Sequence, residues 1–134
     1  MRRKLLVYIG SLLTIFWGIA HIFPLNKVVR GFGNISIDNV HIIQMEWLTE
    51  AYSLIFIGLL TILVTIISRN DRKVANAVYI LVFIMLIQLS VLSIITAFKI
   101  DFLPYKLCPL IFTTAGIMIL QGAFYQKEQL NFVK

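Results

Sequence analysis

Four long apolar segments dominate the pattern of hydrophobic and polar positions along the chain. They cover residues 5–23, 47–67, 77–98 and 107–124, and the polar residues gather between them. Each segment approaches the roughly 20 residues that a helix needs to cross a hydrocarbon core of about 30 Å. None alternates with the period of two that is typical of a membrane-barrel strand. The pattern therefore predicts an all-α polytopic membrane protein, with residues 1–134 forming one domain, a four-transmembrane-helix bundle.

The second apolar segment is preceded by polar residues that keep helical spacing. Pro24 should end the first helix, because the residue before a proline is pushed out of helical geometry. Residues 31–34, Gly-Phe-Gly-Asn, indicate a turn, and Ser36 and Asp38 are candidate N-caps. A helix over residues 38–68 would be on the order of 45 Å long at 1.5 Å per residue. Its first turns should therefore stand outside the hydrocarbon.

Composition excludes an ordinary soluble domain, because only 13% of the residues are charged, against about 25% in soluble domains. The net charge is +6. Eight basic residues lie on the side of the two termini and the middle loop, and four lie in the two loops on the other side. By the positive-inside rule, both termini should be cytoplasmic. The eight are Arg2, Arg3, Lys4, Arg69, Arg72, Lys73, Lys127 and Lys134, and the four are Lys27, Arg30, Lys99 and Lys106. This dispersed charge predicts contact with the lipid bilayer and no nucleic-acid partner.

Two further features have alternative interpretations. Basic residues 2–4, the apolar stretch after them and the small residues up to Ala20 would also suit a cleaved signal peptide, which would leave three spans. We expect an uncleaved helix. Cys108 has no second cysteine with which to form an intramolecular disulfide. We expect it to pack as a small apolar residue at the start of the fourth span, the alternative being a reactive thiol.

Glu46 and Glu50 place two carboxylates where the second apolar segment enters the membrane. A charged side chain at membrane depth costs roughly 2.5–3.5 kcal/mol on insertion scales and tends to face a partner or a cavity. Residues four apart lie on one face of a helix. His21, in the last turn of the first helix, should reach the same outer level, as should polar residues of the third and fourth segments. The predicted ligand-binding site or buried polar network consists of His21, Glu46, Glu50, Thr96, Lys99 and Thr114.

Small and hydroxylated residues form stripes on the first two helices, and such stripes are typical of helix–helix interfaces in lipid. The stripes should therefore face inward and bring His21, Glu46 and Glu50 together. Trp17 and Trp47 are expected in the core and the interfacial belt rather than in a cofactor site. The first stripe consists of Ser11, Thr14, Gly18 and His21, and the second of Glu46, Glu50, Ser53, Thr61 and Thr65.

Four interpretations of the histidine and the two acids differ in their consequences. The simplest is a structural network in which His21 and Lys99 satisfy the acids. General acid–base chemistry on a lipophilic substrate is another, with a desolvated carboxylate and a histidine as the groups. A third is cation recognition by a buried acid, although small multidrug exporters carry that acid midway along the first helix, where this chain has none. A metal site is disfavoured because no HExxH or ExxH pair is present, so no metal ligands are assigned and no cofactor is identified.

Three stretches of the chain resemble a known protein family. They are Gly-Ile-Ala-His-Ile-Phe-Pro at residues 18–24, the Gly-Phe-Gly turn at 31–33 and Glu-Trp-Leu-Thr-Glu at 46–50. The chain resembles small bacterial four-helix membrane proteins of the DoxX-like type. The resemblance implies a location in the bacterial cytoplasmic (inner) membrane and an accessory role in redox or stress physiology. It assigns no catalytic residue.

The sequence thus favours a membrane accessory or binding protein, with an outer-leaflet polar pocket for a small lipophilic ligand or a partner subunit, including a second copy of the chain. One alternative is a membrane enzyme that uses His21 and Glu50 for acid–base chemistry on a lipid-like substrate, and another is a small cation transporter. A pocket between the helices at the level of Glu50 would separate ligand binding or catalysis from a structural network.

Overall fold

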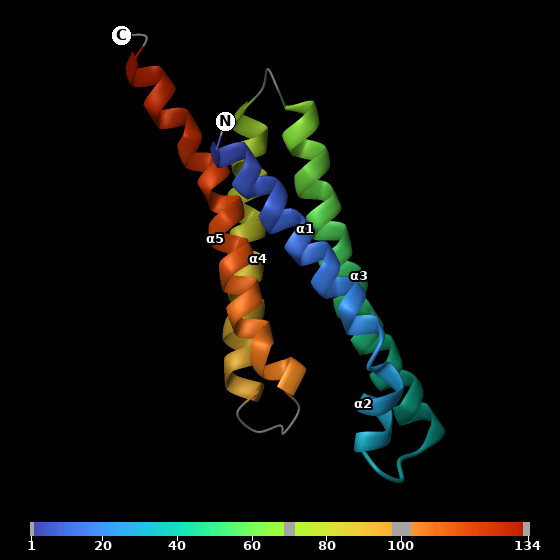
Figure 1. The fold of residues 1–134 in the computed structure, drawn as a ribbon. Helices are drawn as coiled ribbons and strands as arrows, with labels where there is room; N and C mark the ends of the chain where they lie inside the picture. Colours follow the sequence, from blue (N-terminus) through green and yellow to red (C-terminus); the bar gives the residue numbers. More distant parts are fainter. Residues whose placement is uncertain (1, 69–71, 98–102, 133–134) are drawn as a thin grey trace.

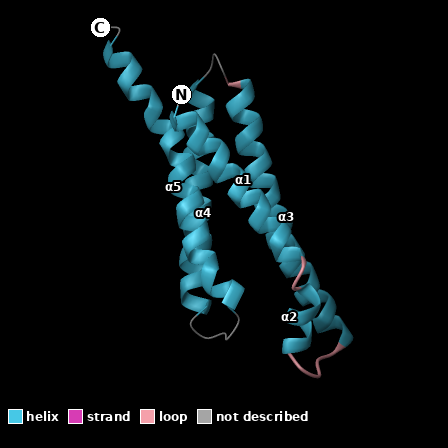
Figure 2. Ribbon diagram, in the orientation of Figure 1, coloured by secondary structure: helices cyan, strands magenta, loops and turns pink. Residues whose placement is uncertain are grey.

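The computed structural model describes residues 2–68, 72–97 and 103–132, and Figure 1 shows its course. Five helices account for nearly all of these residues, and no strand occurs among them (Figure 2). Four of the helices are long and apolar enough to cross a membrane. The predicted all-α, four-transmembrane-helix class is therefore confirmed. In chain order the helices are α1 (Arg2–Ile22), α2 (Leu25–Gly31), α3 (Ile37–Ile67), α4 (Arg72–Ala97) and α5 (Leu103–Phe132).

The connection between α1 and α3 contains a helix that the sequence pattern did not predict. Pro24 follows the end of α1 as expected, but it also occupies the N-cap position of the short helix α2. The predicted turn after α2 is present, and Gly33 adopts a left-handed backbone conformation with φ of +71°, which glycine adopts without steric cost. At the start of α3, the Ser36 hydroxyl accepts a hydrogen bond from the Asn39 backbone N–H at 3.3 Å. Helix α3 thus begins within a residue of the predicted position.

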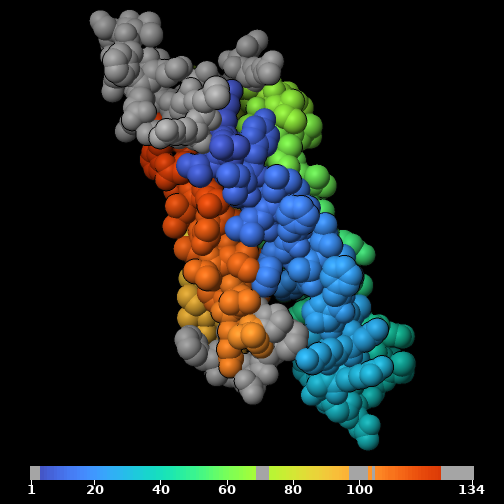
Figure 3. All heavy atoms as spheres, viewed as in Figure 1, coloured from blue at the N-terminus to red at the C-terminus, as the bar shows by residue number. Residues whose placement is uncertain are grey.

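The helices pack as two pairs joined through α1. Helix α1 packs extensively against both α3 and α5, and α4 packs against α5, whereas α3 and α4 touch over a much smaller region. In Figure 1 the α1/α3 pair and the α4/α5 pair diverge toward the end where α2 lies. The space-filling view shows α1 and α5 side by side along the face turned to the viewer (Figure 3). The bundle is therefore tight at one end and more open at the other.

The predicted stripe on α1 faces the protein interior. Ser11, Thr14, Gly18 and His21 are all buried. A Cβ added to Gly18 would lie 2.7 Å from the Ala51 carbonyl oxygen of α3, which shows how closely the two backbones approach. Small residues allow such an approach, and close packing holds helices together in lipid, where the hydrophobic effect between them is absent.

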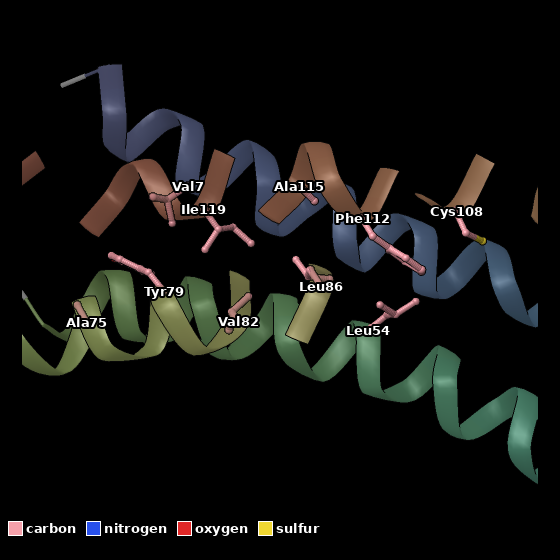
Figure 4. Close-up of a cluster of buried hydrophobic side chains, with 10 residues drawn as sticks. All are labelled: Val7, Leu54, Ala75, Tyr79, Val82, Leu86, Cys108, Phe112, Ala115 and Ile119. Carbon is pink, nitrogen blue, oxygen red and sulfur yellow. The ribbon is translucent and has the colours of Figure 1, made fainter. Parts of the chain in front are cut away.

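A cluster of apolar side chains from α1, α3, α4 and α5 fills the centre of the bundle (Figure 4). Cys108 is one of its members and is 1% exposed, so the prediction that it packs as a small apolar residue is confirmed. Two hydroxyl pairs join helices within the bundle: Thr65 with Tyr79 at 2.8 Å, and Ser90 with Thr113, also at 2.8 Å. The cluster consists of Val7, Leu54, Ala75, Tyr79, Val82, Leu86, Cys108, Phe112, Ala115 and Ile119.

Candidate ligand-binding pocket

His21 and Glu50 lie side by side near the open end of the bundle. His21 belongs to the last turn of α1 and is 5% exposed, and the side chain of Glu50 on α3 is 28% exposed. The His21 Nε2 atom lies 3.7 Å from the Glu50 Oε1 atom. This distance exceeds that of a hydrogen bond, for which about 3.2 Å is the usual upper limit. The two helices thus bring the groups together without committing Nε2 to the carboxyl group.

Aromatic contacts fix the orientation of the His21 ring. The ring stacks on Trp47 of α3, with centroids 5.2 Å apart and an interplanar angle of 22°. Its edge meets Trp17, one turn earlier on α1, with centroids 5.8 Å apart and an angle of 65°. The Trp47 indole N–H donates a hydrogen bond to the backbone carbonyl of His21. Trp47 therefore ties α3 to the end of α1 through both its ring and its polar atom.

Helices α4 and α5 complete the surroundings. Tyr105, near the start of α5, lies 6.1 Å from Trp47 between ring centroids. Its hydroxyl lies near the Thr96 side chain of α4 and the Glu50 carboxyl group of α3. Residues from all four long helices therefore meet around His21 and Glu50.

A pocket of about 550 Å³ lies between the end of α1 and the start of α5. Its walls are mostly apolar and rich in aromatic rings, and Lys27 of α2 also contributes to them. Glu50, which contacts His21, is not itself a wall residue. The lining residues are Trp17, Ala20, His21, Phe23, Pro24, Lys27, Trp47, Leu103, Tyr105, Leu107 and Cys108.

Two polar atoms of the pocket-lining side chains are buried without a strong hydrogen-bond partner. In the part of the chain that the structure describes, neither His21 Nε2 nor Trp17 Nε1 makes a hydrogen bond to an oxygen or nitrogen atom. The Cys108 thiol lies beside the Trp17 indole, but sulfur is only a weak acceptor. A buried polar group left unsatisfied costs about 1–3 kcal/mol. Both atoms have almost no accessible surface, so a ligand in the pocket would contact them only after a movement of side chains.

The remaining residues of the predicted polar site lie at different places. Glu46 is exposed on α3 and is not part of the pocket wall. The Thr96 hydroxyl donates a hydrogen bond to the backbone carbonyl oxygen of Leu92, in its own helix, at 2.9 Å. Thr114 is partly buried on α5, while its neighbour Thr113 makes the hydrogen bond to Ser90. Lys99 lies outside the described residues.

The aromatic walls are the part of the pocket that sequence reasoning missed. Trp17 and Trp47 were expected in the core and the interfacial belt, but both line the pocket. Their spacing contained the signal. Trp17 precedes His21 by four residues and Trp47 precedes Glu50 by three, so each tryptophan shares a helix face with one member of the pair.

A second, shallower hollow of about 600 Å³ lies along α3 and reaches α4 at Met85. These two helices touch each other over a much smaller region than α1 and α3 or α4 and α5 do. Thr49, Tyr52, Ser53, Phe56 and Ile57 provide its other walls, so no titratable carboxylate, histidine or cysteine lines it. Of the two hollows, only the pocket beside His21 therefore has histidine and cysteine side chains in its wall.

The side chains around the pocket include nitrogen, oxygen and sulfur atoms, but they do not form a metal centre within the described residues. The described part of the chain contains no group of three or more histidine, cysteine, aspartate or glutamate side chains placed to hold a metal ion. A comparison of the chain with models of protein families, with curated proteins and with solved structures finds no match. Function has to be inferred from the pocket and its residues.

Proposed function

We propose that this chain is an integral membrane binding protein that holds a small lipophilic molecule in the pocket beside His21 and Glu50. In this proposal the protein resides in a bacterial cytoplasmic (inner) membrane with both termini in the cytoplasm, so the pocket opens at the outer leaflet. The eight-to-four distribution of basic residues supports this orientation. The resemblance to DoxX-like proteins supports the membrane and an accessory role.

The observation that carries the proposal is the pocket itself. Its volume of about 550 Å³ falls within the range of about 300–1,000 Å³ of small-molecule sites. Such sites are mostly apolar with a few polar groups that fix the ligand's orientation, and this pocket combines aromatic walls with a few polar residues, among them Lys27 and Tyr105.

The unsatisfied atoms argue against a purely structural network. Buried polar groups in proteins nearly always have a hydrogen-bond partner. A network that served only to hold helices together should satisfy its members, as Thr65 with Tyr79 and Ser90 with Thr113 do in this bundle. At the pocket, His21 Nε2 and Trp17 Nε1 have not been satisfied in this way.

The contact between His21 and Glu50 favours a second candidate, catalysis on the bound molecule. A histidine beside a carboxyl group is a common arrangement for proton transfer, and the two groups lie 3.7 Å apart. In that case Glu50→Gln, which changes a residue outside the pocket wall, would leave binding intact and abolish turnover. Binding without any turnover supports the first proposal.

The two tryptophans of the chain provide a direct test of binding, because both line the pocket. The protein in lipid nanodiscs would be titrated with 1-bromododecane, whose bromine quenches indole fluorescence on contact. We expect quenching that saturates at a low mole fraction of probe to lipid. Linear quenching with no saturable part, as expected for tryptophans that meet the probe only in the bilayer, would contradict the proposal.

A matched pair of substitutions assigns the saturable part to the pocket. Ala20 lines the pocket, so Ala20→Phe should fill it and weaken saturable quenching about tenfold, which corresponds to about 1.4 kcal/mol. Ala77 is exposed on α4 and is not part of the pocket wall, so Ala77→Phe should bind the probe as the unmodified protein does. Equal effects of the two substitutions would place the probe elsewhere.

A further inference from the structure

A lysine in the pocket wall lies outside the membrane-spanning helices. Lys27 belongs to α2, the short helix that follows α1, and its side chain is exposed. Helix α2 is not one of the four helices that are long and apolar enough to cross a membrane, and it lies at the open end of the bundle (Figure 1). No acidic side chain among the described residues lines the pocket. One end of the pocket therefore carries a positive charge that water can reach.

The apolar part of the wall comes from the membrane-spanning helices themselves. Trp17 and Ala20 belong to α1, Trp47 to α3 and Leu107 to α5, and all four lie within the candidate spans. The character of the pocket thus changes along its length, from a lysine beyond the spans to aromatic and aliphatic walls within them. A molecule with a polar head and an apolar chain matches both parts.

The chemistry of Lys27 suits an anionic head group. Its ammonium group carries three N–H donors and no acceptor. Lys27 already interacts with another group of the protein, but three donors allow it to bind a second partner at the same time. The long side chain can pack its stem along the apolar wall while the ammonium group stays in water. Hydrogen bonds between charged groups are also stronger than those between neutral groups.

We propose that the pocket selects single-chain amphiphiles with an anionic head group, which binds at Lys27 while the chain occupies the apolar part between α1, α3 and α5. This inference rests on the proposed function and specifies its ligand class. The shared chemistry of the head group is that of a carboxylate, phosphate or sulfonate. A quaternary ammonium group, which aromatic rings can hold by cation–π contacts, is disfavoured because Lys27 would face it with a like charge.

Arg30 provides the matched control for Lys27. Both residues belong to α2, three positions apart, and both are exposed. Arg30, however, is not a wall residue. Lys27→Gln and Arg30→Gln each remove one positive charge from the same short helix, but only Lys27→Gln removes a cation from the pocket wall. A general attraction of anions to this surface would be weakened equally by the two substitutions.

The test is displacement of 1-bromododecane, in nanodiscs of zwitterionic phosphatidylcholine, by three competitors of equal chain length: 1-dodecanol, dodecanesulfonate and dodecyltrimethylammonium. The two ions keep their charge throughout the neutral pH range. Potency is expressed as mole fraction in the bilayer, which removes differences in partitioning. We expect dodecanesulfonate to displace the probe at a mole fraction about threefold lower than 1-dodecanol, as an exposed ion pair provides. Dodecyltrimethylammonium should be the weakest of the three.

The variants assign this order to Lys27. Lys27→Gln should remove the advantage of the sulfonate over the alcohol, whereas Arg30→Gln should keep it. Lys27→Glu should reverse the order and favour dodecyltrimethylammonium. Both tryptophans remain as reporters in every variant, and saturable quenching by 1-bromododecane should be unchanged because this probe is uncharged.

Three outcomes would overturn the inference while leaving a lipophile-binding pocket. They are a preference of the unmodified protein for dodecyltrimethylammonium, equal potency of the sulfonate and the alcohol, and an equal loss of the sulfonate's advantage in Lys27→Gln and Arg30→Gln. Absence of saturable quenching of the unmodified protein by 1-bromododecane would instead overturn the proposed function.

Discussion

The imidazole of His21 and the carboxyl group of Glu50 face each other at 3.7 Å across two antiparallel helices. Helices α1 and α3 bring them together because residues 23–36 return the chain to the same end of the bundle (Figure 1). Small residues let the two backbones approach, as Gly18 does against Ala51. The pair thus depends on the same packing that holds the two helices together.

Glu50 should matter more for stability than Glu46, its neighbour one turn earlier on the helix. Glu50 is 28% exposed beside a buried histidine, whereas Glu46 is exposed. Glu50→Ala leaves His21 without its only ionisable neighbour on α3 within 4 Å, and we expect the free energy of unfolding to fall by about 0.5–3 kcal/mol, the usual range for a single substitution. Glu46→Ala should change it by less than about 0.5 kcal/mol. Thermal unfolding in detergent measures both, and equal losses would refute a role for burial of Glu50.

The fold could be predicted from the sequence because its main signals are local. The length and apolarity of each span, the Ser36 cap and the inward stripe on α1 depend on residues within a few turns of each other. The prediction that the stripe on α3 faces inward was only partly right. Thr61 and Thr65 are buried as expected, but Glu46, at the start of the stripe, is exposed. Burial along a helix is decided by the neighbouring helix, and α1 covers only part of the length of α3.

The pocket could be predicted only in outline for the same physical reason. Successive residues on a helix are rotated by about 100°, so the choice between Thr113 and Thr114 as partner of Ser90 depends on the rotation of α5 against α4. The sequence contains no local signal for that rotation. The short helix α2 and the meeting of Tyr105 with Trp47 depend on loop geometry and helix crossing in the same way.

Close backbone contact at Gly18 predicts a strong response to the smallest side chain. A Cβ there would lie 2.7 Å from the Ala51 carbonyl oxygen, an atom of the backbone that cannot rotate away. Gly18→Ala should therefore force α1 and α3 apart and lower the free energy of unfolding by about 1–3 kcal/mol, the usual cost of overpacking. Thermal unfolding in detergent measures the loss.

Gly31 is the matched control for Gly18. It ends the short helix α2, and nothing lies within 4 Å of the position that a Cβ would occupy. Gly31→Ala should leave the unfolding temperature unchanged or raise it slightly, because alanine has the higher helix propensity. If both substitutions are tolerated equally, α1 and α3 do not approach as closely as the structure places them.

The hydroxyl pair of Thr65 and Tyr79 joins α3 to α4, two helices that otherwise touch over only a small region. A double-mutant cycle of Thr65→Val and Tyr79→Phe removes this hydrogen bond with little change in volume. We expect a coupling energy of about 0.6 kcal/mol, the average for such bonds between membrane helices, and at most about 1.7 kcal/mol. The cycle is measured by unfolding in a mild detergent. Additive effects, with no coupling, would show that the two hydroxyls do not interact.

The orientation of the protein decides which leaflet supplies the ligand, and cysteine labelling tests it. In a Cys108→Ser background, Asn34→Cys would place a thiol in the turn before α3, where the native side chain is exposed. Asn70→Cys would place one in the middle loop, between two of the basic residues on the side predicted to be cytoplasmic. Eight basic residues against four predict that a membrane-impermeant maleimide labels the first thiol in intact cells and the second only after permeabilisation. The reverse pattern would place the pocket at the cytoplasmic leaflet, because His21 lies in the last turn of α1, the end of that helix from which α2 leads to the Asn34 turn.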